Sequence, residues 1–149
     1  MSRRIDFGDR DWNAHAQDRW LEWAGNPNFP DHLRIVFVAY GRRRANGHAR
    51  LDQGELAGFL VRPDGTLPDR RTIWHAIDKA IRYEFLLSES RALCLVVSKD
   101  HVQGGRGNPD ERCKRKHGTQ QKDVSHARPF TLVPSLSSRT VTPDQPEAS

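Results

Sequence analysis

The chain has 149 residues and a formal net charge of +5, with 36% apolar and 29% charged residues, a sequence pI of about 9.7 and a mean hydropathy of −0.79. This length allows one domain with a core, and the basic balance favours a polyanionic partner such as nucleic acid. The absence of a long apolar run or apolar leader, together with only two cysteines, excludes a membrane span and a disulfide framework, so we expect an unprocessed cytoplasmic protein with no membrane partner.

The first predicted element is a helix from Asp9 to Gly25, within a tryptophan-rich N-terminal unit of residues 1–30. Trp12, Trp20 and Trp23 fall near one stripe of a 3.6-residue period, which indicates packing against the core. Three large aromatic side chains on a surface segment also favour a homodimer that forms through this helix. Core packing is the simpler interpretation of the three tryptophans.

The central unit, residues 31–98, begins with a second predicted helix from Asp31 to about Gly41. After a turn with three arginines, the stretch from His48 to Leu51 is suited to a small strand. Asp52 then precedes a short helix, and Glu55 three residues later completes the pattern of a capping box.

The clearest helix follows Asp69, which is a favourable N-cap. Its apolar positions recur at i, i+3, i+4, i+7 and i+8, and they are Ile73, Ala76, Ile77, Ala80 and Ile81. This spacing defines one buried face and leaves a cationic face toward water. After the helix, two apolar runs, Phe85–Leu87 and Leu93–Val97, predict a β-hairpin with a polar tip.

Helix, short strand, short capped helix, longer helix and hairpin is the order of a winged helix-turn-helix. The predicted fold class is therefore mainly α with a small β-hairpin, a winged helix-turn-helix with an extra N-terminal helix. Residues 99–118 form a basic, glycine-rich extension, and residues 119–149 are predicted to be a disordered tail because they are rich in Ser, Thr and Pro.

The run GHARLDQGELAGFL…RRTIWHAIDKAIRYEFLLSESRALCLVV resembles winged helix-turn-helix DNA-binding proteins, in particular the small ones of actinobacterial phages and related mobile elements. The resemblance covers about residues 31–117, and the tryptophan helix is also similar to theirs. It implies sequence-specific binding of double-stranded DNA by a transcriptional regulator, with a wing at the hairpin tip.

The candidate DNA contacts fall in three groups of the sequence. They are Arg70, Arg71, Trp74, His75, Lys79 and Arg82 on the long helix, Arg91 at the hairpin tip, and Arg42, Arg43 and Arg44 before the first strand. Arg71 and His75 are predicted to reach base edges, because arginine offers a planar fork to guanine. The other cations would contact phosphates. Alternatives remain open: Trp74 as a cover of the core edge, and the three arginines as a solvated turn.

A second constellation is Cys94, His101, Cys113 and His117. Two cysteines and two histidines supply the four ligands of a tetrahedral zinc ion, which would be structural. Small proteins that resemble this one also carry a Cys after the wing and a downstream Cys and His beyond a GGxGNP-like segment, as here from Gly104 to Pro109. The alternative for Cys94 is a buried small hydrophobe.

No enzyme is predicted. His101 and Asn108 beside a zinc ion would suit a nuclease, but the sequence after His101 has loop character and lacks the strand and helix of such a site. No small-molecule ligand is evident. Two other functions stay open, a replication or recombination accessory protein and a protein-binding inhibitor of a host factor. Steep weakening of binding with salt would favour DNA over a protein partner.

Overall fold

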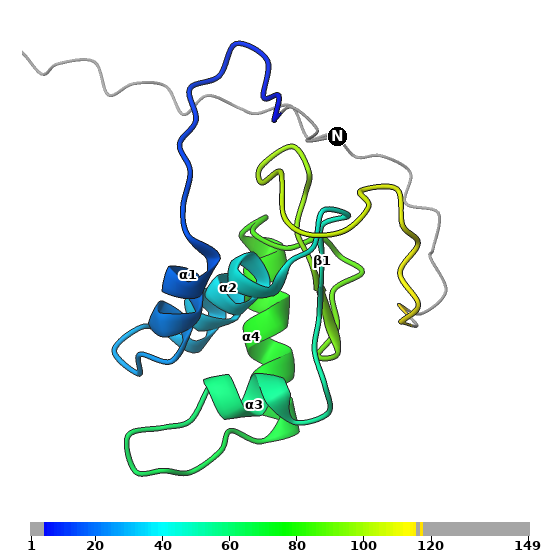
Figure 1. Ribbon diagram of the computed structural model, residues 1–149. Helices are drawn as coiled ribbons and strands as arrows, with labels where there is room; N and C mark the ends of the chain where they lie inside the picture. The colour runs from blue at the N-terminus through cyan, green and yellow to red at the C-terminus, as the bar shows by residue number, and fades with distance from the viewer. Residues whose placement is uncertain (1–4, 116, 118–149) are drawn as a thin grey trace, which may run out of the picture.

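The computed structural model describes residues 5–115 and 117, and within them the chain is mainly helical with one small antiparallel sheet, as the sequence predicts (Figure 1). The elements follow in the order α1 (Gln17–Ala24), α2 (Asp31–Arg42), β1 (His48–Arg50), α3 (Glu55–Phe59), α4 (Arg70–Arg82) and β2 (Cys94–Val96). The predicted tail, residues 119–149, lies outside the described residues.

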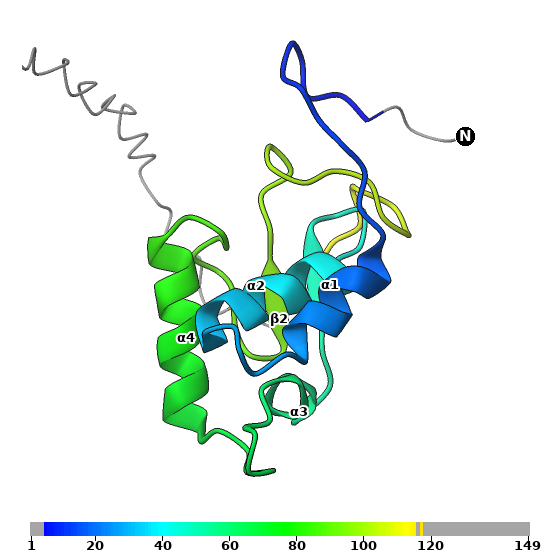
Figure 2. The same ribbon diagram turned by 90° about the vertical axis from the view of Figure 1, so that its left-hand side faces the viewer.

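Helix α2 lies at the centre, with α1 on one side, α4 on another and the two strands beyond (Figures 1 and 2). The largest side chains of the core that are almost fully shielded from water come from α2, from the two strands and the residues that follow them, and from the end of α3. They are Ile35, Val36, Val38, Leu51, Leu60, Leu95 and Val97. The apolar residues of the chain therefore gather in one core, as the low mean hydropathy requires.

Helix α1 is shorter than the sequence predicts, because it begins at Gln17 and the backbone of Ala16 is extended. Trp20 packs against Phe37 and Tyr40 of α2, with ring centroids 5.6 and 5.2 Å apart. Trp12 lies before the helix and is 55% exposed. Trp20 thus makes the predicted contact with the core. Trp23 is 39% exposed but its ring lies 6.0 Å from that of Phe37, whereas Trp12 remains on the surface.

A buried arginine joins three helices. Arg34 of α2 is only 2% exposed, and its guanidinium donates to the carbonyl oxygens of Ala24, Phe59 and Val61 at 2.8, 2.6 and 3.2 Å. Asp31 lies 3.5 Å from the same guanidinium. Arg34 therefore satisfies backbone groups at the ends of α1 and α3 and fixes both helix ends against α2.

The predicted capping box before α3 is half formed. The Asp52 amide donates to the Glu55 carboxylate at 2.9 Å, but the Asp52 side chain does not cap the helix. It lies instead 3.5 Å from the Arg115 guanidinium.

Helix α4 has the predicted cap and buried face. The Asp69 carboxylate accepts from the Thr72 amide at 2.6 Å, and Ala76, Ile77 and Ala80 are buried. At the other end Glu84 has a φ of +63°, and the Phe85 amide donates to the Ala80 carbonyl. The helix thus ends in a left-handed cap that glycine usually provides.

The strands pair differently from the predicted hairpin. Strand β2 pairs with β1, with His48 opposite Val96 and Arg50 opposite Cys94. The Phe85–Leu87 run forms no strand, although the Leu87 amide donates to the Val96 carbonyl at 2.9 Å. Residues 88–93, between the Phe85–Leu87 run and β2, form a tight turn, which we call the wing turn.

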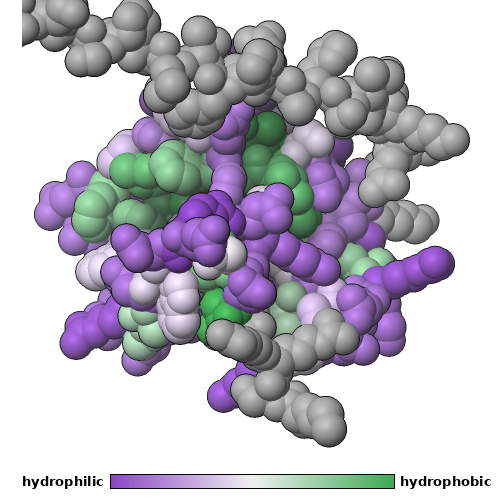
Figure 3. Space-filling model, turned by 90° about the horizontal axis from the view of Figure 1, so that it is seen from above, coloured by the Kyte–Doolittle hydropathy of each residue, from purple (hydrophilic) through white to green (hydrophobic). Residues whose placement is uncertain are grey.

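None of the helices in the described part of the chain has the length and apolar character needed to cross a membrane. From above, apolar side chains appear as separate patches among hydrophilic ones (Figure 3).

Candidate nucleic-acid interface and metal centre

The polar face of α4 points away from the rest of the domain, and Figure 2 shows this helix at one edge of the molecule. All six candidate residues of this helix are exposed, and we call them the α4 outer face: Arg70, Arg71, Trp74, His75, Lys79 and Arg82. Trp74 is 59% exposed, so it does not cover the core edge. The face combines four cations with one aromatic ring and one imidazole.

Neighbouring side chains on the α4 outer face hold one another in place. The Arg71 Nε lies 3.3 Å from the His75 Nε2, and the Trp74 and His75 rings pack edge to face with centroids 5.0 Å apart. Arg82 pairs with Asp78 at 3.1 Å. These contacts partly order long side chains, which reduces the entropy lost when they bind a ligand.

The wing turn is closed by backbone hydrogen bonds between Arg91 and Cys94. The Arg91 guanidinium donates to the carbonyl oxygens of Ser88 and Ser90 at 3.0 and 2.7 Å, while the side chain of Arg91 stays at the exposed tip. Ser90 is buried, and its hydroxyl accepts from the Val96 amide. The turn therefore presents one cation on a fixed backbone.

The three consecutive arginines before β1 contact protein groups. Arg42 pairs with Glu55 at 2.6 Å, and Arg43 donates to the carbonyl oxygens of Gln103 and Gly104. Arg44 lies 3.5 Å from the Glu111 carboxylate. Arg43 and Arg44 thus join α2 and the turn before β1 to the segment after β2, whereas Arg42 joins α2 to α3. A phosphate-binding role for the three arginines stays a prediction.

Four side chains form a cluster that could hold a metal ion. The ligand atoms of His48, Cys94, Cys113 and His117 all lie within 4.8 Å of one another. His48 comes from β1 and Cys94 from β2. Both lie on the same face of the sheet, because Cys94 is directly opposite Arg50, which is two residues after His48 in β1. Cys113 and His117 come from the segment that follows β2.

Three of the six spacings among these atoms are close to those around a tetrahedral zinc ion. The Cys94 and Cys113 sulfurs are 3.7 Å apart, the Cys94 sulfur is 3.5 Å from His48 Nδ1, and the Cys113 sulfur is 3.2 Å from His117 Nε2. Around zinc, with bonds of about 2.3 Å to sulfur and about 2.0 Å to nitrogen, tetrahedral angles put two sulfurs about 3.8 Å apart and a sulfur–nitrogen pair about 3.5 Å apart.

The second nitrogen of His117 is held by the wing turn. Its Nδ1 lies 3.0 Å from the Glu89 carbonyl oxygen, to which a protonated Nδ1 donates. This contact fixes the ring and leaves Nε2 free as a ligand, as is usual for histidines that bind metals. A cleft of about 500 Å³, lined by His48, Cys113 and His117 among others, gives an ion access to the cluster.

The two thiols of the cluster differ in acidity. Burial, together with the neighbouring Cys113 sulfur, raises the pKa of Cys94 to about 12. Burial also opposes ionisation of Cys113, but its hydrogen bonds, first of all with His117, bring its pKa below the ordinary value. Burial and the nearby His117 lower the pKa of His48. Two thiols so close together ionise together only when a positive charge compensates them.

His101 is not part of this cluster, which corrects the predicted ligand set. It is exposed and lies in the loop after β2, where it lines an open cavity of about 690 Å³ together with His15, Trp20 and Tyr40. His48 is the fourth member instead. The sequence signal for His48 was weak, because it lies 46 residues before Cys94 and reaches it only through pairing of β1 with β2.

No protein-family model matches the chain, and neither a curated protein nor a solved structure similar to it was found.

Proposed function

We propose that this protein binds double-stranded DNA sequence-specifically through the α4 outer face, as a transcriptional regulator with a winged helix-turn-helix domain. The observation that carries the proposal is that α4 buries its aliphatic face and leaves Arg70, Arg71, Lys79 and Arg82 on one surface that no other described residue covers. A helix with such a surface fits the width of the major groove.

The order and pairing of the elements support this domain type. In a winged helix-turn-helix, α2, α3 and α4 are the three helices, and α4 is the recognition helix. The pairing of β1 with β2 and the hydrogen bond from Leu87 to Val96 place the wing turn next to the sheet. Arg91 at its tip would then contact phosphates or the minor groove.

Each residue of the α4 outer face has a proposed role. Arg71 and His75 would contact base edges, because Arg71 offers two parallel donors to guanine O6 and N7. Arg70, Lys79 and Arg82 would contact phosphates, which position the protein but do not read sequence. Trp74 would pack against a sugar or a thymine methyl group.

The test is selection of bound fragments from a random duplex pool, followed by fluorescence anisotropy with the selected duplex. We expect Arg71→Ala to weaken binding by about tenfold or more, as loss of one bidentate base contact does. The matched control is Arg19→Ala, which removes an exposed arginine paired with Glu22 on α1. Wild-type binding should also weaken steeply with salt.

Two outcomes would contradict the proposal. One is that the Arg71→Ala and Arg82→Ala variants both bind the selected duplex with the affinity of the wild-type protein. The other is the absence of any duplex binding at low salt, which would favour a protein partner for the α4 outer face.

We also propose that the metal held by His48, Cys94, Cys113 and His117 is zinc and that its role is structural. Two thiolates and two imidazoles are a donor set that zinc prefers, and four protein ligands leave no open position for a substrate or water. Elemental analysis of the protein purified without added zinc tests this. About one equivalent is expected, and less than about one tenth would reject the zinc centre.

A further inference from the structure

The segment after β2, residues 98–115 and 117, is held on the domain in a different way from the helices. It forms no helix or strand among the described residues, and Val102 is its one hydrophobic residue that packs against the core. We call it the C-terminal segment. Since burial of apolar surface contributes little here, other contacts must hold it in place.

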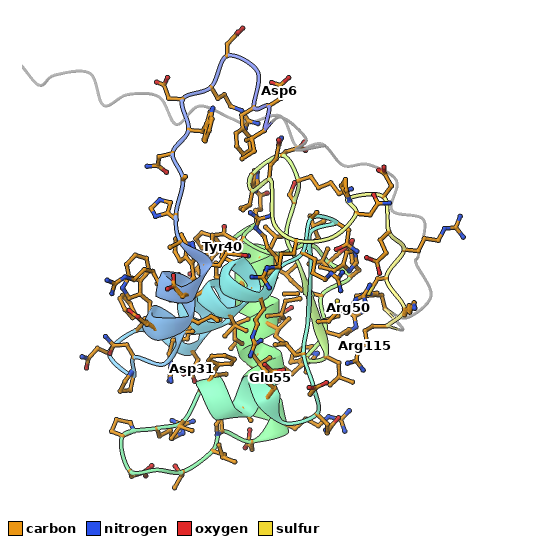
Figure 4. All side chains as sticks on the ribbon, viewed as in Figure 1. Asp6, Asp31, Tyr40, Arg50, Glu55 and Arg115 are labelled. Carbon is orange, nitrogen blue, oxygen red and sulfur yellow. The ribbon has the colours of Figure 1, made fainter. Side chains whose placement is uncertain are left out.

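Those other contacts are polar and partly buried. The Asn46 side chain donates to the Glu111 carbonyl at 2.9 Å, and Arg50 lies 3.1 Å from the Glu111 carboxylate. Arg115 donates to the Leu51 carbonyl. Figure 4 shows Arg50 and Arg115 on the same side of the molecule. The ion pairs of the segment are within reach of water and contribute little to stability. The segment therefore depends on a few hydrogen bonds, among them those that Arg43 donates to the Gln103 and Gly104 carbonyl oxygens.

The metal cluster is where this segment meets both strands and the wing turn. Cys113 and His117 belong to the C-terminal segment, whereas His48 and Cys94 belong to β1 and β2. His117 also contacts the Glu89 carbonyl of the wing turn. One ion bound here would therefore connect the segment, the sheet and the turn at a single point.

We infer that zinc bound at this cluster clamps the C-terminal segment and the wing turn onto a helical core that folds without the metal. This inference rests on the proposed zinc centre and goes beyond it, because a structural zinc ion often holds a whole small domain together. Here a continuous apolar core joins α2 to α4, and the buried Arg34 holds the ends of α1 and α3 against α2. Loss of zinc should release the segment and loosen the turn while the helices remain.

The experiment is limited trypsin digestion of the full chain, with zinc bound and after removal of zinc by a chelator. The C-terminal segment offers cleavage sites after Arg106, Arg112, Lys114 and Arg115. We expect the initial rate of cleavage at these sites, read by mass spectrometry, to rise by about tenfold or more on zinc removal. The helical signal in circular dichroism should stay nearly unchanged.

Amide hydrogen exchange reports on the wing turn in the same two states. The amides of Ser90, Arg91 and Cys94 donate within the turn, and we expect faster exchange at these positions without zinc. Protection of amides inside α2 and α4 should be preserved. Adding zinc back should restore slow cleavage and slow exchange, which shows that the chelator acts through the metal.

Matched variants separate the ligands from the rest of the segment. His117→Ala and Cys113→Ser should bind less zinc and be cleaved rapidly without a chelator. His101→Ala should behave like the wild-type protein, because His101 lies outside the cluster. If a ligand variant fails to fold, the comparison of wild-type protein with and without zinc still decides.

The outcomes distinguish the clamp from the zinc centre. Less than about one tenth of an equivalent of zinc in the wild-type protein would overturn the proposed zinc centre and the clamp with it. One equivalent of zinc with equal cleavage rates in both states would overturn the clamp alone. Loss of the helical signal on zinc removal would also overturn it, because the metal would then hold the entire domain.

Discussion

Helix α4 and the C-terminal segment show two ways in which one small domain holds its functional parts. Helix α4 docks through buried Ala76, Ile77 and Ala80, and its cap comes from a residue next to it in sequence. The C-terminal segment docks through ion pairs, carbonyl contacts and the cluster of two cysteines and two histidines. Hydrophobic packing therefore holds the helix that carries the proposed recognition surface. Polar contacts and the Cys/His cluster hold the C-terminal segment.

The difference predicts where substitutions have global effects and where they have local ones. Substitutions that disturb the junction of the helices should lower the free energy of unfolding of the whole domain. Substitutions in the C-terminal segment should change its local opening and leave the unfolding of the core nearly unaffected.

The largest effect is expected at Arg34. Arg34→Met removes a buried guanidinium and leaves the carbonyl oxygens of Ala24 and Phe59 without their donor. We expect the free energy of unfolding to fall by about 3 kcal/mol, since buried polar groups that lose a partner are costly. Urea denaturation followed by circular dichroism measures it.

The control for this variant is Arg19→Met. Arg19 is exposed, and among the described residues its guanidinium pairs with the Glu22 carboxylate. Its free energy of unfolding should change by less than about 0.5 kcal/mol. Equal effects of the two substitutions would contradict the role given to Arg34.

A smaller effect is expected at the cap of α4. The hydrogen bond from the Thr72 amide lowers the pKa of Asp69 below its ordinary value of 3.8. A carboxylate with a lowered pKa stabilises the fold above the unfolded pKa, and this contribution is lost as the pH falls through the folded value. The thermal midpoint of the wild-type protein should therefore decrease as the pH is lowered below about 4.

Asp69→Asn is the matched variant, because its amide oxygen still caps the helix but does not titrate. The difference in thermal midpoint between the two proteins should narrow or reverse below pH 4, where the wild-type cap loses its charge. A difference that does not vary with pH would show that the Asp69 charge does not stabilise α4.

The smallest global effect is expected at Glu111, whose carboxylate lies near Arg44 and Arg50. Glu111→Gln removes these ion pairs, which are partly exposed and are weak for that reason. The urea midpoint of the domain should stay close to that of the wild-type protein, whereas trypsin should cut faster after Arg106 and Arg112. A large loss of global stability would contradict the contrast between the core and the segment.

Local patterns carried the sequence prediction of α4. The i, i+3, i+4 spacing of Ile73 to Ile81 and the preceding Asp69 are all within 13 residues, so helix bounds and cap follow from short-range rules. The candidate ligands Cys94, Cys113 and His117 were predicted from their residue types and from a resemblance to small proteins with a similarly placed Cys and His, and the structure brings the three together.

What the sequence did not predict depends on contacts between distant residues. Pairing of β1 with β2 brings His48 to Cys94, and no periodicity in a three-residue strand specifies its partner. The buried role of Arg34 is also nonlocal, because its acceptors lie up to 27 residues away. An arginine in an amphipathic helix gives no sign that its guanidinium is buried.

The most direct test of the proposed DNA-binding surface is a map of backbone amide shifts by NMR, recorded as the selected duplex is added to the zinc-loaded protein. We predict that the largest shifts fall on α4 and the wing turn, centred on Arg71, His75 and Arg91. Shifts confined to α1 and the residues before it, with α4 unchanged, would contradict the proposal that α4 recognises DNA.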